Sequence, residues 1–228
     1  CAPCIRLPRR PPAHSLACPT CENLAFSLQA LPVCQIAAKF LPSISRMLGS
    51  MMIETIQNAD LSILHAIQGA ASPALDAFMV GFTTLGEFGA LWAIVGAIMI
   101  ALNKHRTFGI AIFVAIALAF VIGDVGLKNI IGRPRPFLVD PALTTSLVSL
   151  PGSFSCPSGH TSSSFAAATV ICLAPLAHRW LKPVAMAAAA VIAFSRLYLA
   201  VHNPTDVIFG ALLGIACGCV AVCIVKAI

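Results

Sequence analysis

Long apolar segments with few charges constrain this chain more than any other feature of its sequence. Of the 228 residues, 59% are apolar and 10% are charged, whereas a soluble domain carries about a quarter charged residues. A helix that crosses a bilayer needs roughly 20 mostly apolar residues, and the chain from about residue 88 onward has room for five such helices. We therefore expect an all-α fold, a polytopic transmembrane helix bundle with about five full spans.

The apolar pattern places these spans and the connections between them. The expected spans are residues 88–102, 107–131, 158–177, 183–201 and 205–226. Before them, residues 54–70 have an amphipathic pattern, and Pro73 opens a second short helix that reaches about Leu85. We expect these to be one or two short interfacial helices. The loop over 132–157 is far longer than the other connections, and such loops tend to be functional.

The first fifty residues differ in composition from the rest of the chain. They hold five of the fourteen Lys and Arg residues against one acid, Glu22. They have no helical or strand periodicity and no continuous apolar segment typical of a signal peptide. We therefore expect residues 1–50 to be a disordered leader or a mis-extended reading frame, with Met51 or Met52 as the start. Residues 51–228 would form the membrane-embedded domain.

Two CxxC pairs in this leader leave a second interpretation open. Cys1 and Cys4 are separated from Cys18 and Cys21 by thirteen residues, which is close to the spacing of a zinc ribbon. No strand pattern supports a ribbon, but an appended zinc-bearing interaction module remains the alternative.

Basic residues predict the orientation of the bundle and the location of a site. Span alternation places one group on a single face, which the positive-inside rule makes cytoplasmic: Lys104, Arg106, Arg179, Lys182 and Lys226. A second group lies at the opposite face: Lys128, Arg133, Arg135 and Arg196. Ionisable residues at membrane depth usually mark a functional site, so we interpret the second group as phosphate ligands. The net charge of +6 does not indicate nucleic-acid binding, because no basic stripe with interleaved aromatics is present.

Three short segments carry the chemistry, and span alternation brings them to the same non-cytoplasmic end. The second span ends in Lys128 and the run Arg133-Pro134-Arg135-Pro136. The third opens with Pro157-Ser158-Gly159-His160, where unpaired N–H groups at a helix start favour an anion. The fourth ends near Ser195 and Arg196 and is followed by His202 and Asp206.

These segments resemble the three-part signature of the type 2 phosphatidic acid phosphatase superfamily. The matching patterns are Lys-x6-Arg-Pro (Lys128, Arg135, Pro136), Pro-Ser-Gly-His (157–160) and Ser-Arg-x5-His-x3-Asp (Ser195, Arg196, His202, Asp206). Every signature position matches, and the resemblance covers roughly residues 52–226, as in small bacterial members.

The resemblance implies a role for each matching residue. His202 would be the nucleophile that forms a phosphohistidine, with Asp206 accepting a hydrogen bond from its other ring nitrogen. His160 would be the general acid and then the base. The phosphate would be held by Lys128, Arg135, Ser158, Gly159 and Arg196. Because three cations and a helix end can replace a metal ion in phosphoryl transfer, we expect no metal and no cofactor.

The expected function is therefore hydrolysis of a lipid phosphate or diphosphate in the cell membrane. The partners would be the lipid bilayer and a lipid substrate, with no nucleic acid, and the sequence leaves the oligomeric state open. An external site suits undecaprenyl diphosphate, which we rank first, ahead of phosphatidylglycerol phosphate and phosphatidate. A vanadate-dependent haloperoxidase is a second enzymatic reading, against which the spans argue. A non-catalytic lipid-binding or transport protein of the same fold is the alternative of another class.

Several other residues have simpler interpretations. Asp124 should pair with Lys128 one helical turn later, and His65 should be a satisfied core residue. Arg133 has an alternative to phosphate binding, in which it faces headgroups or solvent. Trp92 and Trp180 should anchor at the interface. Ordinary packing is expected for Cys156, with a reactive thiol near the cations as the alternative.

Overall fold

A computed structural model describes residues 51–103, 105–176 and 178–227. The chain divides into two compact units, 1–55 and 56–228. In the first unit, the described residues 51–55 are helical, and the Thr55 hydroxyl donates to the Met51 carbonyl oxygen at 2.7 Å. The predictions for the leader and for its CxxC pairs lie outside the described residues. Everything below concerns the second unit.

The described part of the chain before Arg106 forms three helices and a short 3-10 turn. Residues 51–68 are helical. Helix α3 (Pro73–Leu85) begins with a proline at its first turn, where the missing N–H costs nothing. The short η1 (Glu87–Gly89) follows, with Phe88 and Gly89 in the left-handed region at φ 50° and 70°. Helix α4 (Ala90–Ala101) then leaves at an angle of 48° to α3.

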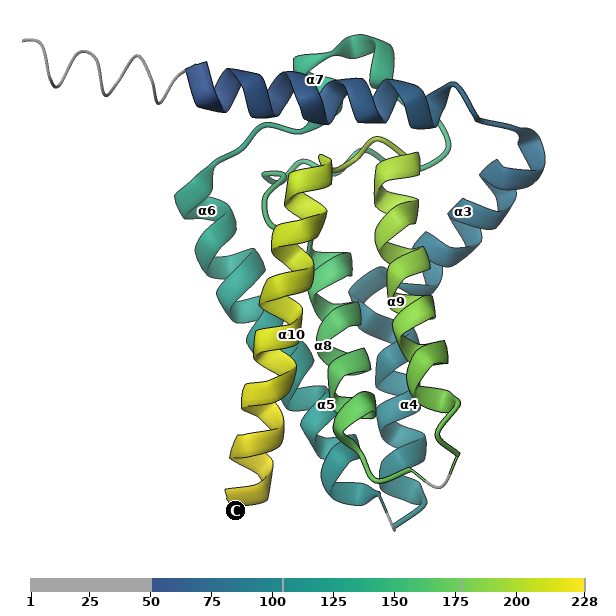
Figure 1. Cartoon of the computed structure of the whole chain (residues 1–228), viewed down its shortest axis with the longest axis vertical. Helices are drawn as coiled ribbons and strands as arrows, with labels where there is room; N and C mark the ends of the chain where they lie inside the picture. Colours follow the sequence, from purple (N-terminus) through teal and green to yellow (C-terminus); the bar gives the residue numbers. More distant parts are fainter. Residues whose placement is uncertain (1–50, 104, 177, 228) are drawn as a thin grey trace, which may run out of the picture. The chain divides into compact units, whose positions relative to one another are not determined.

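The bundle itself consists of antiparallel helices joined at alternate ends (Figure 1). Its first member is α4, which packs against α5. The second is continuous from α5 (Arg106–Ala119) through the π-helical η2 (Phe120–Leu127) to α6 (Lys128–Ile131), and Gly132 ends it at φ 60°. The long loop holds two short turns, α7 (Pro136–Val139) and η3 (Pro141–Leu143). The remaining helices are α8 (Gly159–Leu173), α9 (Leu181–Tyr198) and α10 (Pro204–Ala227).

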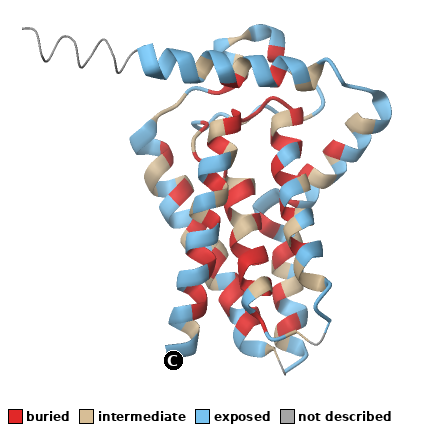
Figure 2. Cartoon of the chain, viewed as in Figure 1, coloured by how far each residue is buried: buried red, intermediate tan, exposed pale blue. Residues whose placement is uncertain are grey.

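Helix α8 forms the centre of the bundle and packs against α5, α9 and α10. Nine of its fifteen residues are buried, most of them Ala, Ser or Thr, which is why red dominates this helix in Figure 2. Small side chains allow neighbouring helices to approach closely. On α10, Gly210, Gly214 and Gly218 face the backbone of α8, where an added Cβ at any of them would meet a carbonyl oxygen at 2.8 Å or less.

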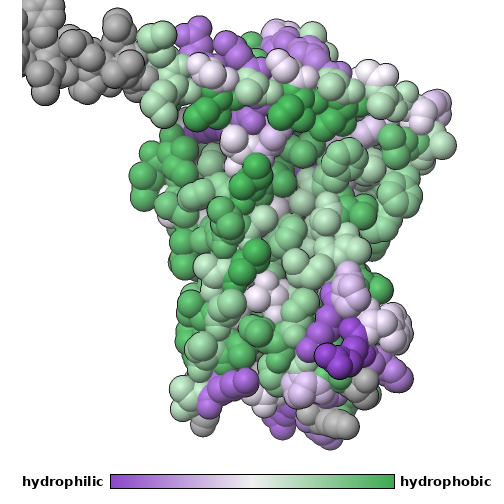
Figure 3. All heavy atoms as spheres, in the orientation of Figure 1, coloured by the Kyte–Doolittle hydropathy of each residue, from purple (hydrophilic) through white to green (hydrophobic). Residues whose placement is uncertain are grey.

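The described residues confirm an all-helical fold with no strand, but they do not confirm five full spans. Three helical stretches are long and apolar enough to cross a membrane, Arg106–Val139, Leu181–Tyr198 and Pro204–Ala227, and the bent pair α3–α4 makes up to four. The expected span over 158–177 is the one missing from this set. It corresponds to α8, whose fifteen residues reach only about 22 Å and which is surrounded mainly by other helices. On the face drawn in Figure 3, hydrophobic residues cover the middle and hydrophilic residues gather toward both ends.

The two ends of the bundle carry the residues that the alternation of spans predicts. Arg106 opens α5, Lys182 lies in the first turn of α9, and Lys226 lies in the last turn of α10. Lys226 Nζ stands 5.3 Å from the centre of the Phe108 ring, so the end of α10 adjoins the start of α5. Lys104 lies outside the described residues. The three signature segments lie at the opposite end of the bundle.

Among the simpler interpretations, those for Trp92 and His65 are wrong. Trp92 is not an interfacial anchor, because it is buried and its Nε1 donates to Ser164 Oγ of α8 at 2.9 Å; Trp180, by contrast, is exposed. His65 is not a core residue. Its side chain is 48% exposed and its Nε2 lies 2.7 Å from Asp140 Oδ2, an ion pair that lowers the pKa of the exposed Asp140 carboxyl.

Candidate active site

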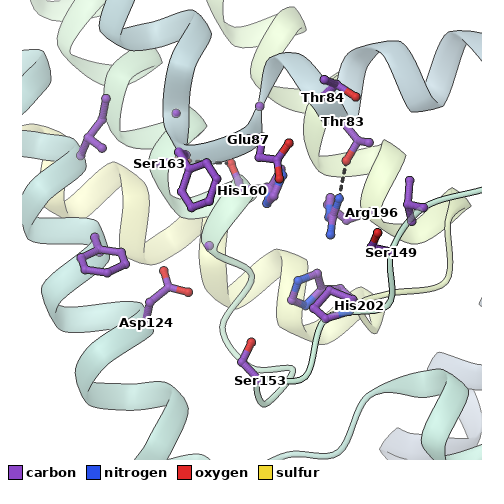
Figure 4. A pocket seen from close by; sticks show the side chains of 18 of the residues that line it. Thr83, Thr84, Glu87, Asp124, Ser149, Ser153, His160, Ser163, Arg196 and His202 are labelled. Carbon is purple, nitrogen blue, oxygen red and sulfur yellow. Dashed lines mark hydrogen bonds between the residues drawn. The ribbon is translucent and has the colours of Figure 1, made fainter.

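A cavity of about 860 Å³ opens at the end of the bundle where the three signature segments meet. Six of the eight residues predicted for the site line it: Lys128, Arg135, Gly159, His160, Arg196 and His202. Figure 4 shows His160, Arg196 and His202 turned toward one space from three different segments. The other two predicted residues, Ser158 and Asp206, are fully buried and do not line the cavity.

His202 lies on the short connection between α9 and α10, with its two ring nitrogens in different surroundings. Nε2 is 3.5 Å from an Arg135 guanidinium nitrogen, on the cavity side. Nδ1 is 3.8 Å from Asp206 Oδ2, which is an ion-pair distance but beyond hydrogen-bond reach, and it is buried without a partner among the described residues. Burial, reinforced by the nearby Arg135 and Arg196 charges, lowers the pKa of His202 to about 3. The imidazole is therefore neutral at physiological pH.

The two arginines of the cavity, Arg135 and Arg196, are held by different numbers of hydrogen bonds. Arg135 is held by carbonyl oxygens: its Nε donates to Ser153 O at 2.7 Å, and one terminal nitrogen donates to Val201 O at 2.7 Å. Arg196 donates to the Thr83 hydroxyl, while its buried Nε has no partner among the described residues. A buried donor without a partner is costly, so this nitrogen is suited to an incoming anion.

Lys128 lies at the junction of η2 and α6 and pairs with Asp124, which confirms the predicted i,i+4 contact. The π-helical turn of η2 carries Asp124, and such turns often occur at functional sites. The Asp124 carboxylate also faces the start of α8, because a Cβ added at Gly159 would lie 2.7 Å from Asp124 Oδ2. A side chain at this position would fill the space at the helix start.

The start of α8 presents backbone N–H groups to the cavity. Its N-cap, Ser158, makes no side-chain hydrogen bond to the helix. The Ser158 hydroxyl instead accepts a hydrogen bond from Thr161 at 2.9 Å, and the Ser158 N–H donates to Asp206 O at 3.2 Å. Gly159 and His160, the first two helical residues, line the cavity. The positive helix end and the cations therefore act on the same space.

The structure adds residues that the motifs do not contain. Thr83, from α3, fixes Arg196, and Ser153 from the long loop accepts from Arg135 with both its carbonyl and its hydroxyl oxygen. Ser155 from the same loop donates to Asp206. Glu87 and Asp124 line the cavity. The length of the 132–157 loop was the one sequence signal that pointed toward some of them.

Cys156, beside this site, is a half-buried free thiol. Burial, and then the negative charge of Asp206, raise the pKa of its thiol to about 12. A thiol this far from ionisation is a poor nucleophile. Among the described residues, no group of three or more His, Cys, Asp and Glu side chains is arranged to hold a metal ion.

The fold and the site thus define a helical membrane protein with a cationic cavity at one end of its bundle. Residues 108–228 match the family model of the PAP2 superfamily, and the chain belongs to that superfamily.

Several proteins are similar to this chain in sequence. An undecaprenyl-diphosphatase of Sulfolobus acidocaldarius is 34% identical over 126 residues, which cover 54% of this chain and 58% of that protein. The match therefore spans less than two thirds of that relative. A lipid A 4'-phosphatase of Bacteroides thetaiotaomicron is 31% identical over 172 residues, 72% of this chain and 75% of that protein.

Two solved structures are similar in fold and sequence. A PAP2-type phosphatidylglycerolphosphate phosphatase from Bacillus subtilis has a TM-score of 0.63 and 28% identity, and the match covers 76% of this chain and 88% of that one. LpxE of Aquifex aeolicus has a TM-score of 0.59 and 31% identity, and the match covers 71% and 93%.

Proposed function

We propose that this protein is an integral-membrane phosphatase that hydrolyses a lipid phosphate or diphosphate through a phosphohistidine on His202. One observation carries the proposal: a neutral, buried imidazole meets three cations and a second histidine around one cavity. Phosphoryl transfer needs mainly positioning and stabilisation of charge on the phosphoryl oxygens, and this arrangement supplies both.

In the first step, His202 Nε2 attacks phosphorus and the bond from phosphorus to the leaving oxygen breaks. Nε2 is the attacking atom because it faces the cavity cations, whereas Nδ1 faces Asp206. Burial and the neighbouring cations lower the pKa of His160 to about 3, so His160 enters this step protonated only when the negative charge of the bound substrate raises that pKa again. The imidazolium then gives its proton to the leaving oxygen. The Asp206 carboxylate stabilises the positive charge that develops on the imidazole. We propose that a small rotation of the ring first closes the gap of 3.8 Å between Nδ1 and Asp206 Oδ2.

In the second step, water attacks the phosphohistidine, His160 accepts the proton of that water, and phosphate leaves with His202 restored. Lys128, Arg135 and Arg196 hold the phosphoryl oxygens in both steps, together with the Gly159 N–H. Ser158 supports the start of α8 from behind, through its contact with Thr161. We propose that no metal ion takes part, because these cations and the helix end supply the positive charge.

The walls of the cavity favour a lipid over a soluble phosphate ester. Phe88, Phe113 and Phe120 line it, and each of the three is also exposed on the outer surface. These three aromatic side chains beside a phosphate site suit a lipid substrate, whose phosphorylated headgroup would enter the cavity while its hydrocarbon remains in the bilayer.

Among lipids we rank undecaprenyl diphosphate first. A site on the non-cytoplasmic side, as the basic residues at the other end predict, fits the recycling of this carrier. The Sulfolobus relative, named as an undecaprenyl-diphosphatase, supports the ranking. The likeness to the Bacillus subtilis phosphatidylglycerolphosphate phosphatase supports the second candidate, a phosphatidylglycerol phosphate or phosphatidate phosphatase.

The test is phosphate release by the detergent-purified protein from undecaprenyl diphosphate, phosphatidylglycerol phosphate and phosphatidate. The full chain should release phosphate from at least one of them, and His202→Ala should abolish release. The matched control is His65→Ala, since His65 is an exposed histidine far from the cavity lining. Turnover by His202→Ala above a few per cent of the unmodified protein would remove the phosphohistidine scheme. Absence of release from every lipid would leave the non-catalytic lipid-binding alternative.

A further inference from the structure

Arg133 was predicted to bind phosphate or to face headgroups or solvent, but it lies behind the cavity and donates to four acceptors. It does not line the cavity. One terminal nitrogen donates to Thr205 Oγ1 at 2.6 Å and to Asp206 Oδ1 at 2.7 Å. The other donates to Gln57 Oε1 at 2.8 Å and to Asp60 Oδ2 at 2.7 Å. We call these five residues the Arg133 cluster.

Asp60 brings the helical residues 56–68 into this cluster. It is 2% exposed, although it belongs to an amphipathic helix at the end of the bundle (Figure 1). Besides Arg133, it accepts hydrogen bonds from the Thr205 N–H at 3.2 Å and the Thr205 hydroxyl at 2.5 Å. A carboxylate buried to this degree needs a positive partner. Arg133 serves Asp60 and Asp206 together, so the positions of the two carboxylates are coupled through one guanidinium.

A second route joins the same helix to Asp206. Gln57 Nε2 donates to Asn203 Oδ1 at 3.3 Å, and Asn203 donates to Asp206 Oδ2 with its backbone N–H at 2.8 Å and its side-chain amide at 3.2 Å. Ser155, whose hydroxyl donates to the same oxygen, is itself fixed because its N–H donates to Arg133 O at 2.8 Å. The residues that donate to Asp206 Oδ2 are therefore themselves held by hydrogen bonds. Gln57 holds Asn203, and the Arg133 carbonyl oxygen holds Ser155.

We propose that Asp60 and Arg133 are positioning residues, which fix the Asp206 carboxylate beside His202 Nδ1 and so aim Nε2 at phosphorus. The amphipathic helix then contributes to catalysis through Asp60, which positions Asp206 by way of Arg133. The inference rests on the proposed function, because it assumes that Asp206 acts on His202. If Arg133 is displaced, Asp206 Oδ2 keeps its donors Ser155 and Asn203. Oδ1 loses the Arg133 guanidinium, and the carboxylate can then rotate.

The test is a double-mutant cycle on the full chain in detergent, with p-nitrophenyl phosphate as substrate. Asp60→Asn should lower kcat by up to roughly 100-fold with little change in KM. In an Asp206→Asn background, the same substitution should have almost no further effect, because the group through which it acts is already disabled. A purely structural role for Asp60 would lower activity by the same factor in both backgrounds, and this additive result would overturn the proposal.

Binding constants give a second readout that does not depend on the fraction of active protein. Vanadate, which bonds to the attacking nitrogen, should bind Asp60→Asn more weakly, whereas inorganic phosphate, held by the cations, should bind as before. The matched control is His65→Ala, which removes another polar contact of the same helix, the one to Asp140. It should leave kcat and both affinities unchanged, and a loss equal to that of Asp60→Asn would contradict the inference.

Two further variants keep the test decisive. If Asp60→Asn does not fold, Gln57→Met removes an acceptor of Arg133 without burying a new charge, and it should show the same non-additivity with Asp206→Asn. Arg133→Lys, which keeps the charge but not the fork of two nitrogens, should retain more kcat than Arg133→Gln. If His202→Ala proves active, the proposed function itself is wrong. If His202→Ala is inactive but the cycle is additive, only the positioning role fails.

Discussion

The close contact between α8 and α10 leads to a sharp prediction for Gly218→Ala. A Cβ added at Gly218 would lie 2.6 Å from Ala166 O and 2.8 Å from Thr169 Cβ, both on α8. An ordinary carbon-to-oxygen contact between helices is about 3.3–3.6 Å, so the helices must separate by roughly 0.7 Å or more. Because Ala166 O is backbone, no side-chain rotation relieves the contact.

The expected cost combines two opposing contributions. Overpacking of this kind costs about 1–3 kcal/mol. Replacing glycine by alanine inside a helix returns about 0.5–1 kcal/mol. The free energy of unfolding of Gly218→Ala should therefore fall by up to about 2.5 kcal/mol, and the midpoint of thermal unfolding should fall with it.

Gly81→Ala is the matched control, since it is the same chemical change in the interior of α3 with nothing within 4 Å of the new Cβ. It should raise the midpoint slightly, because only the gain in helix propensity remains. Both midpoints can be measured by heating the detergent-solubilised protein and following the folded fraction by size exclusion. Equal shifts in the same direction would refute the close approach of α8 and α10.

The remaining predictions concern the chemistry and the sidedness of the site. With His160→Ala, the first step on p-nitrophenyl phosphate should suffer less than on a lipid phosphate, since a phenolate leaves with less protonation; burst kinetics showing equal loss for both substrates would refute the acid role. Activity should survive EDTA and be inhibited by vanadate, and a loss in EDTA that added Mg²⁺ restores would contradict the metal-free scheme. In a variant without native cysteines, Thr144→Cys should react with an impermeant maleimide on intact spheroplasts and Arg179→Cys only after lysis. The reverse pattern would place the site in the cytoplasm and favour an intermediate of phospholipid synthesis as substrate.

Local features of the fold and of the site could be predicted because they depend on residues close in sequence. The pair of Asp124 and Lys128 follows from one helical turn. The break before α4 follows from Gly86 and Gly89, and the start of α3 follows from Pro73. The apolar pattern also predicted a full span over residues 158–177, and this span is not confirmed, because α8 has fifteen residues and is shorter than the helices that could cross a membrane by length and composition.

The sequence by itself determined which segments meet. Apolar segments that alternate in direction bring Lys128, His160 and His202 to one end of the bundle, whatever the details of packing. Only the tertiary structure decided what each polar group touches there. Arg133 and Arg135 are two residues apart and each precedes a proline. Arg135 lines the cavity, whereas Arg133 binds Asp60, which is 73 residues away in the sequence. Hydrophobic periodicity carries no information about such contacts, because they depend on how the 132–157 loop and the helical residues 56–68 pack on the bundle. That packing is set by buried carboxylates which must find a positive partner.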